Sequence, residues 1–403
     1  MDLNGFINRW SIWGSKVNSK LSILILFLLS IAYGLSDWIY SYFTFSEYIL
    51  FFITLFLLST FHFKLYKKQV LFISFIALFL IAHLLYHVFI ARLPHWQLSL
   101  AAIIKLLFYI TTLFMVINYI RVRSQIELFL KINNITAIFL VFIGLFIIIL
   151  LYRESTIPQN VLWRFTRTDE SSYYYESSQI IRSRSLFSEP AHFGFYLNSL
   201  LLANLFYWKK LKYNYLTIVL LTLGIISTFS YSMIFIMIII YFCRLLDLYI
   251  KKRIAFRKWT YFVIALILLA VIYNWDIINV TVIQRTLAII SGEDISARIR
   301  LINSWQYVSR DTLLMGNGIG QTPIITNVYA YMLSDFGLIG FIGKLSLTAY
   351  ISFKNWKFGI VFLLLNFAKG GYLSSGYWFM MIIFIIYGLV NRDHDSLKNI
   401  KDQ

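Results

Sequence analysis

Long apolar runs follow one another along almost the whole chain, and they constrain its fold more than any other feature. Hydrophobic residues make up 60% of the 403 residues and charged residues only 13%, which no water-soluble domain tolerates. A helix that crosses a bilayer needs about 20 apolar residues, so about twelve such helices would account for most of the hydrophobic residues. We therefore predict an all-α integral membrane protein, with a single polytopic membrane domain over residues 1–403.

The helices are expected where the apolar runs lie. Two stretches, Leu216–Ile250 and Phe358–Val390, are too long for one membrane-spanning helix. Polar turns interrupt them at Ser227–Ser232 and Lys369–Ser375, so we divide each stretch into two helices. The resulting runs are 21–36, 46–63, 69–90, 98–120, 133–152, 190–208, 214–228, 231–249, 259–275, 327–343, 358–371 and 375–390.

Lysines and arginines are concentrated in one set of connections between these runs. These basic connections lie at 64–68, 121–131, 209–212, 251–258 and 354–357. Because basic residues favour the cytoplasmic side of a membrane, we predict that these connections and both chain ends are cytoplasmic. Two longer connections, at 153–189 and 276–326, then lie outside.

The net charge of +18 has the same explanation. Since the lysines lie on short connections between apolar runs, the charge indicates contact with anionic lipid at the cytoplasmic surface, and no nucleic-acid partner. The single cysteine, Cys243, excludes a disulfide within the chain and a metal site built from cysteines.

The segment from Ile181 to Gly194 combines charges of both signs between two apolar blocks. Arg182 and Arg184 can present two guanidinium forks to a phosphate or diphosphate. Glu189 precedes Pro190, and proline is favoured at the first position of a helix. We therefore expect Glu189 at the rim of a helix that continues into the next apolar run.

The second long connection carries a further pair of arginines. Arg298 and Arg300 open an amphipathic helical pattern over residues 298–305. The glycine-rich run that follows, Gly316–Gly320, lacks the lysine of a P-loop and the strand–helix frame of a dinucleotide site. We therefore predict that these glycines make a tight turn.

Taken in order, these segments resemble the Wzy-type O-antigen polymerases, which are related to the O-antigen ligases. The resemblance covers roughly residues 120–390. It rests on Arg184, Phe187–Gly194, Ser227–Ser232, Arg298, Met315–Gly320 and Asn327–Gly340, together with the two long outer connections.

The resemblance implies a glycosyltransferase of the bacterial inner (cytoplasmic) membrane, with an active site that faces the periplasm. Its substrates would be a donor and an acceptor oligosaccharide, both linked to undecaprenyl diphosphate, and it would use no metal, nucleotide sugar or other cofactor. Membrane lipid and a chain-length regulator protein are the further partners that the resemblance suggests.

The chain departs from the ligase relatives at one position. In those proteins a histidine implicated in catalysis commonly precedes the segment that matches Asn327–Gly340, whereas this chain has Thr326 there. The role of that histidine cannot be carried over, so the catalytic base has to be sought elsewhere.

The implied reaction defines what the charged residues would do. A hydroxyl of the acceptor attacks the anomeric carbon of the donor, and negative charge grows on the departing lipid diphosphate. We expect this charge to be met by arginines, because the outer connections show no convincing cluster of metal ligands. The predicted diphosphate-binding residues are Arg182, Arg184, Arg298 and Arg300, although some of them could instead pair with Asp169, Glu170, Glu189 or Asp294.

Glu189 is the first candidate for the base that removes the acceptor proton, and His192 is the second. Each has an alternative role. Glu189 beside two arginines is a poor base at rest, because its charged form is stabilised. Its role could instead be to orient an arginine. His192 could be a polar residue that is hydrogen-bonded within the helix bundle.

Two other functions remain as alternatives to a polymerase. A flippase for lipid-linked oligosaccharide also has about twelve helices, but it should carry charges scattered through its helices and short loops on both faces. This chain concentrates many arginines in two long outer connections, which favours an enzyme. An O-antigen ligase, which transfers glycan to lipid A core, is the alternative within the same class.

Overall fold

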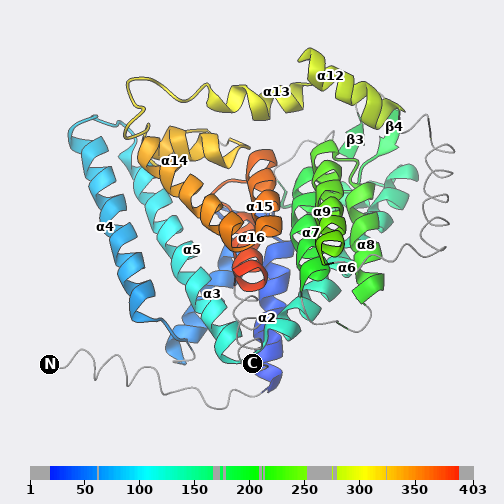
Figure 1. Ribbon diagram of the computed structural model, residues 1–403, viewed down its shortest axis with the longest axis horizontal. Helices are drawn as coiled ribbons and strands as arrows, with labels where there is room; N and C mark the ends of the chain where they lie inside the picture. Colours follow the sequence, from blue (N-terminus) through cyan, green and yellow to red (C-terminus); the bar gives the residue numbers. More distant parts are fainter. Residues whose placement is uncertain are drawn as a thin grey trace.

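The computed structural model describes residues 19–60, 63–166, 173–175, 178–207, 211, 214–251, 275, 279–323 and 325–389. Helices make up nearly all of the regular structure in these ranges, which confirms the all-α class (Figure 1). The long helices are α2 (Ser19–Gly34), α3 (Phe45–Ser59), α4 (Lys67–Phe89), α5 (Trp96–Val122), α6 (Ile126–Tyr152), α7 (Pro190–Phe206), α8 (Asn214–Ser227), α9 (Tyr231–Ile250), α14 (Val328–Lys354), α15 (Trp356–Ala368) and α16 (Ser375–Ile383).

Most of these helices lie within a few residues of the predicted apolar runs. Two predictions were too short: α6 starts before the predicted run at 133–152, and α14 continues well past the predicted run at 327–343. The two long stretches divide where the polar turns predicted it, between α8 and α9 and between α15 and α16. A π-helical segment, Phe384–Leu389, continues α16. The run at 259–275 lies outside the described residues, apart from its last residue.

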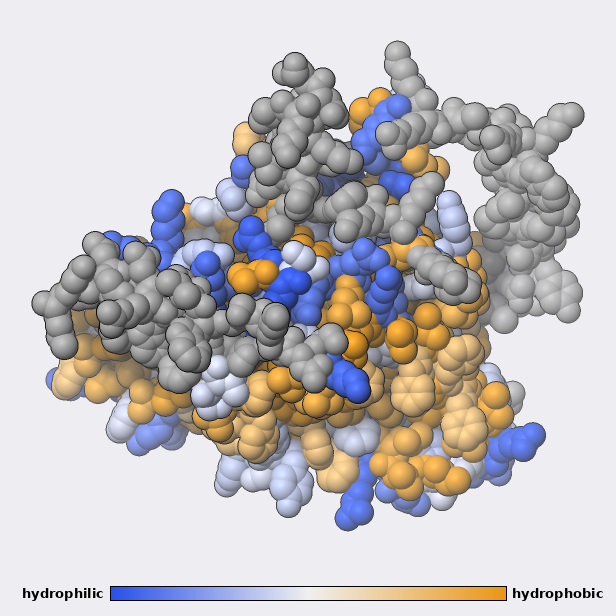
Figure 2. All heavy atoms as spheres, turned by 90° about the horizontal axis from the view of Figure 1, so that it is seen from below, coloured by the Kyte–Doolittle hydropathy of each residue, from blue (hydrophilic) through white to orange (hydrophobic). Residues whose placement is uncertain are grey.

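The helices have the composition of membrane-embedded segments. Within the described ranges, five are long and apolar enough to cross a membrane, namely α4, α5, α6, α9 and α14. The shorter helices α2, α3, α8, α15 and α16 are also apolar. Large hydrophobic side chains such as Phe52, Phe75 and Phe139 are exposed, as expected of surfaces that face lipid. Seen from below, hydrophobic side chains cover much of the surface and hydrophilic ones gather between them (Figure 2). The chain is therefore a multi-pass membrane protein.

Helix α7 is the centre of the bundle. Every residue from Pro190 to Asn204 is buried except His192. The helix packs against α6, α8, α9 and α16. By contrast, α4 lies at one side of the bundle (Figure 1) and buries only Leu80, His83 and His87. A polar residue on this part of the central helix is thus surrounded by protein, and His192 is the one partly exposed residue among Pro190–Asn204.

Short strands join the first outer connection to the turn after α2. Strands β1 (Ile39–Tyr40) and β2 (Phe43–Thr44) form one antiparallel hairpin, and β3 (Tyr174–Tyr175) pairs with β4 (Ser178–Ile181) in another. Trp38 bridges to Thr166, and the Ile39 amide donates to the Phe165 carbonyl at 2.8 Å. Residues 37–44 are therefore held against the connection that leads to α7.

The second outer connection contains more helix than the sequence predicted. Helices α12 (Arg285–Ser291) and α13 (Ile295–Leu301) run across the top of the bundle (Figure 1). The sequence predicted a helix over residues 298–305, but α13 begins and ends earlier. Its N-cap is Asp294, whose Oδ1 accepts from the Ala297 amide at 2.6 Å. Trp305 lies in a separate 3₁₀ turn, Asn303–Trp305.

The glycine-rich run forms the predicted turn. Gly316, Gly318 and Gly320 all have positive φ angles. The turn packs directly on the backbone of α14 where that helix is kinked at Gly337 (φ 66°, ψ −158°). A Cβ on Gly316 would lie 2.4 Å from the Asp335 carbonyl oxygen, and a Cβ on Gly337 would lie 2.3 Å from the Leu314 carbonyl oxygen. Only glycine allows this close approach of two backbones.

We predict that Gly337→Ala destabilises the protein by about 2–4 kcal/mol, because a side chain there is strained at positive φ and overlaps the Leu314 carbonyl. Gly343→Ala in the same helix is the matched control. A Cβ at Gly343 meets nothing within 4 Å, so alanine should be neutral or stabilise the helix by about 0.5–1 kcal/mol. Thermal unfolding in detergent measures both, and equal stabilities would contradict the close approach.

Candidate functional site

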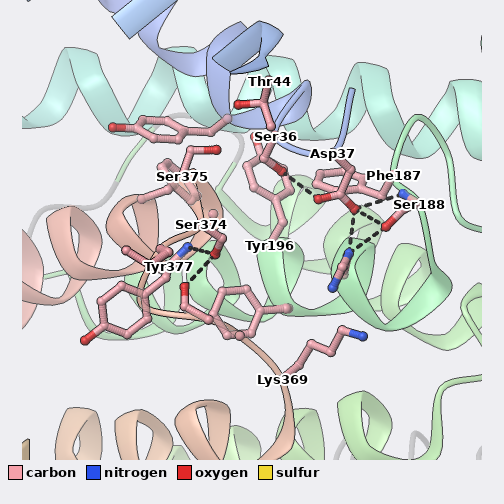
Figure 3. Close-up of a pocket in the computed structure, with 18 of the residues that line it drawn as sticks. Ser36, Asp37, Thr44, Phe187, Ser188, Tyr196, Lys369, Ser374, Ser375 and Tyr377 are labelled. Carbon is pink, nitrogen blue, oxygen red and sulfur yellow. Dashed lines mark hydrogen bonds and ion pairs between the residues drawn. The ribbon is translucent and has the colours of Figure 1, made fainter. Parts of the chain in front are cut away.

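A cavity of about 510 Å³ opens beside the first turn of α7 (Figure 3). Its walls come from the turn after α2, the start of α7, the segment before α14 and the α15–α16 connection. The polar residues in the part of the cavity next to the start of α7 are Asp37, Ser188, Glu189, His192, Thr326 and Lys369. Aromatic side chains form much of the remaining wall, among them Tyr33, Phe187, Phe195, Tyr196, Tyr331 and Phe379. This mixture of aromatic walls and a few converging polar groups is typical of a ligand site.

The start of α7 is built as the sequence predicted. Pro190 is the first helical residue, and Glu189 is the N-cap with extended backbone angles (φ −139°, ψ 151°). Two tryptophan indoles hold the chain just before it, since Trp38 Nε1 donates to the Leu186 carbonyl at 2.7 Å and Trp163 Nε1 donates to the Ser185 carbonyl at 2.8 Å. The positions of Ser188 and Glu189 are therefore fixed by residues from two other parts of the chain.

Asp37, Ser188 and His192 form one hydrogen-bonded cluster. Asp37 Oδ2 accepts from the Ser188 amide at 2.9 Å and from the Ser188 hydroxyl at 2.5 Å, and it lies 2.5 Å from His192 Nδ1. Figure 3 shows the Asp37 and Ser188 side chains meeting at this point. A carboxylate on Nδ1 favours the tautomer with the proton on that nitrogen, so the lone pair of Nε2 is free to accept a proton.

The environment of Asp37 keeps it charged. Burial would raise its pKa, but the charge of His192 and the hydrogen bonds from His192 and Ser188 outweigh burial and hold the pKa of this carboxyl well below its usual range. The His192 side chain is 31% exposed, and its Nε2 makes no hydrogen bond to any described residue. The pair thus has the arrangement of a base and the carboxylate that orients it.

Glu189 is engaged by a lysine. Lys369 Nζ lies 2.7 Å from Glu189 Oε2, and the lysine is nearly buried, whereas the carboxylate is 41% exposed. Burial would raise the pKa of Glu189, but the charges of Lys369 and His192 lower it to about 2. Figure 3 shows Lys369 across the cavity from Asp37 and Ser188. Glu189 is therefore ionised at neutral pH and is a weak proton acceptor.

Arg184 does not line the cavity. It is 2% exposed, its guanidinium lies 3.6 Å from the centroid of the Trp163 ring, and Nη1 donates to the Ser188 carbonyl at 2.8 Å. A guanidinium stacked on an indole and hydrogen-bonded to the backbone fixes the turn that carries Ser188. Its contacts are those of a residue that positions the site.

Three other arginines converge on the turn between α8 and α9. Arg182 Nε donates to the Thr228 carbonyl at 3.3 Å, and Arg300 Nη1 donates to the Ser232 hydroxyl at 3.2 Å. The Arg285 guanidinium lies 6.0 Å from the ring of Tyr231, in the same turn, and Arg285 also pairs with Asp294 at 2.9 Å. Both long outer connections thus bring cations to residues 228–232.

Arg300 lies close enough to Glu189 for their charges to interact. Burial and the charge of Arg285 lower the pKa of Arg300, while Glu189 and Asp294 oppose the shift. Arg300 is also joined to the cavity wall through the backbone, because its carbonyl accepts from Asn327 Nδ2 at 3.4 Å and the neighbouring Thr326 lines the cavity. Arg298, on the same helix as Arg300, is exposed and makes no side-chain hydrogen bond or ion pair within the described ranges.

The structure thus brings together some of the predicted residues and separates others. Glu189 and His192 share one cavity, and Arg182 and Arg300 share one turn, whereas Arg184 is internal and Arg298 faces outward. Thr326, at the position of the histidine in the ligase relatives, also lines the cavity, and its hydroxyl is buried with no hydrogen-bond partner among the described residues. No group of three or more metal-binding side chains occurs in the described part of the chain.

Asp37 was missed in the sequence because nothing in its neighbourhood suggests a site. It lies in the short connection between the first two apolar runs and is the one charged residue between Lys20 and Glu47. A lone carboxylate in a short connection without basic residues was the available signal. Its distance from His192, 155 positions along the chain, hid the pairing.

Comparisons with known proteins add no assignment to this geometry. No protein-family model matches the chain, and no characterised protein matches its sequence significantly.

We predict that Arg184→Ala destabilises the fold by about 2–4 kcal/mol, because it removes the stacking on Trp163 and leaves the Ser188 carbonyl without this donor. Arg153→Ala is the control, since Arg153 is exposed at the end of α6 and its loss should change stability by less than about 0.5 kcal/mol. Thermal unfolding of both variants measures the difference. Wild-type stability of Arg184→Ala would show that this arginine does not hold the turn.

Proposed function

We propose that this protein is a Wzy-type O-antigen polymerase that joins undecaprenyl-diphosphate-linked repeat units at the periplasmic face of the bacterial inner membrane. The growing glycan passes from its lipid diphosphate to a hydroxyl of the incoming unit. The observation that carries the proposal is the Asp37–His192 pair in a cavity whose rim is coupled to an arginine cluster. The resemblance of the sequence to this family supports it.

The proposed topology has twelve spans, with both termini cytoplasmic and residues 153–189 and 276–326 external. Lys251 and Lys357, from two of the basic connections, both pair with Asp247 near the end of α9. The arginine cluster lies at the start of α9, at residues 228–232, and the cavity lies beside the start of α7. These two basic connections and the cavity are thus at opposite ends of the bundle. Because basic connections favour the cytoplasmic side of a membrane, this arrangement supports a periplasmic site.

In the proposed reaction, Arg182, Arg285 and Arg300 meet the diphosphate of the donor. Three guanidinium groups at one turn supply a concentrated positive charge with forked donors. As the bond between the anomeric carbon and the phosphate oxygen breaks, its electron pair leaves with the lipid diphosphate. The arginines stabilise that charge. Arg184 supports the turn that carries Ser188, and Arg298 has no direct role.

His192 is the proposed base. The acceptor hydroxyl forms the new bond to the anomeric carbon and gives its proton to Nε2 of His192. Asp37 stabilises the imidazolium that results and keeps the ring oriented. This order reverses our preference from the sequence, where Glu189 came first, because Glu189 is paired with Lys369 and has a pKa of about 2.

A reconstituted reaction tests the function. Purified protein in liposomes, supplied with undecaprenyl-diphosphate-linked repeat units, should give a ladder of longer lipid-linked glycans without added metal or nucleotide sugar. Arg182→Gln and Arg300→Gln should each lower the rate at least about 100-fold, because they remove charge from the leaving-group site. Arg153→Gln, at an exposed arginine away from the cluster, is the control and should retain the wild-type rate.

A deletion strain separates the alternative functions. Loss of a polymerase leaves single repeat units on lipid A core, with long chains absent. Loss of a ligase leaves the core bare while polymer accumulates on the lipid carrier. Loss of a flippase traps repeat units on the cytoplasmic face. A bare core in the deletion strain, or no ladder with the purified protein, would overturn the polymerase proposal.

We predict different effects for the two candidate bases. His192→Gln should lower the polymerisation rate about 10²–10⁴-fold, the usual contribution of a general base, and Asp37→Asn should lower it by a smaller factor. Glu189→Gln should keep the acid limb of the pH–rate profile in place, because a carboxyl with a pKa of about 2 stays ionised across the assay range.

The measurement is the pH dependence of the initial rate for each variant at equal expression. If Glu189→Gln abolished the acid limb and His192→Gln preserved it, the roles of these two residues would have to be exchanged.

A further inference from the structure

The part of the cavity away from His192 contains a second charged cluster. Lys105 Nζ lies 2.6 Å from Glu47 Oε1, and the Tyr109 hydroxyl donates to the same oxygen at 2.6 Å. All three residues line the cavity. The Tyr109 ring stacks on Trp378 of α16 with centroids 5.8 Å apart, so the cluster lies beside Ser375 and Tyr377. Figure 3 shows these two on the opposite side of the view from Asp37 and Ser188.

The hydrogen bonds of this cluster leave the lysine available to a ligand. Glu47 is nearly buried, and its other oxygen accepts from the Thr44 amide at 2.7 Å, so both carboxylate oxygens are engaged. The Lys105 side chain is 34% exposed. An ammonium group has three protons, and Glu47 engages one face of it. The carboxylate therefore positions an ammonium whose remaining donors face the cavity.

The charge of the lining indicates what kind of ligand fits. The two lysines of the cavity, Lys105 and Lys369, each pair with a carboxylate, and Asp37 adds a third negative group. A diphosphate would not find net positive charge here. Uncharged hydroxyl groups would find an ammonium donor, serine hydroxyls and aromatic walls, which suits a sugar ring better than an anion.

We propose that Lys105, held by Glu47 and Tyr109, forms the subsite that binds the sugar of the acceptor through its hydroxyl oxygens. This assignment rests on the proposed polymerase function. The donor diphosphate belongs at the arginine cluster, on the α8–α9 side of Glu189, and in a direct displacement the nucleophile approaches from the side away from the leaving group. The Lys105 cluster lies in the part of the cavity away from Asp37 and Ser188, so we assign that part to the acceptor.

Binding without turnover tests this subsite. Two probes are used with protein in nanodiscs: the lipid-free repeat-unit oligosaccharide prepared from the polysaccharide of the source bacterium, and farnesyl diphosphate. The Glu47→Gln, Lys105→Gln double variant removes both charges and leaves no unpaired carboxylate. It should weaken oligosaccharide binding at least about tenfold, the usual size of a lost hydrogen bond to a charged group. Farnesyl diphosphate binding should change less than about twofold.

The matched control is the Glu127→Gln, Lys131→Gln double variant. That lysine–glutamate pair is 2.7 Å long, close to the 2.6 Å of the cavity pair, but it lies at the start of α6, away from the cavity. Both probes should therefore bind this variant as they bind the wild type. Thermal unfolding checks that the variants fold. If the cavity variant unfolds, Lys105→Arg replaces it, because a guanidinium keeps the ion pair but moves the donors and should also weaken oligosaccharide binding.

Unchanged oligosaccharide affinity in the cavity variant overturns the subsite. Loss of farnesyl diphosphate binding with normal oligosaccharide binding also overturns it, and makes Lys105 an anion site. The polymerase proposal fails separately, if the wild-type protein elongates no glycan while its oligosaccharide affinity still depends on Lys105.

Discussion

The carboxylate of Asp37 is the point on which the site depends. Its Oδ2 accepts hydrogen bonds from the Ser188 amide, the Ser188 hydroxyl and His192 Nδ1. These bonds join the turn after α2 to the start of α7. Because His192 is the one residue among Pro190–Asn204 of α7 that is not buried, these contacts place its imidazole where the central helix meets the cavity. A largely buried carboxylate left without such donors would be costly, so the Ser188 and His192 contacts stabilise Asp37 in this position.

Around this cluster, the connections between helices are held in place by side chains from distant parts of the chain. Trp38 and Trp163 donate hydrogen bonds to the backbone before Ser188. Arg184 stacks on Trp163 and donates to the Ser188 carbonyl. The glycine turn at 316–320 is fixed on kinked α14 by the Asp335 carboxylate, which accepts from the Gly320 amide at 3.0 Å and from the Tyr372 hydroxyl. These contacts make a preorganised cavity above apolar helices.

The division of the arginines has a physical basis. A guanidinium can either pack on an aromatic ring or present its fork to an anion, and burial decides between these roles. Arg184 and Arg182 are two residues apart in the irregular segment between β4 and α7, and their side chains make different contacts. One is buried over Trp163 and the other reaches the 228–232 turn. The sequence alone could not say which of the two arginines would be internal, and it predicted diphosphate binding for both.

The sequence by itself determined the membrane class, the helix positions and the helix start at Pro190, because these follow from local hydrophobicity and backbone preference. It also identified Glu189 and His192, which are neighbours in one helical turn. Only the tertiary structure decided that Asp37 pairs with His192, that Lys369 neutralises Glu189 and that Glu47 holds Lys105. Those pairs join residues 155, 180 and 58 positions apart. A sequence pattern carries no information about which helices will pack side by side.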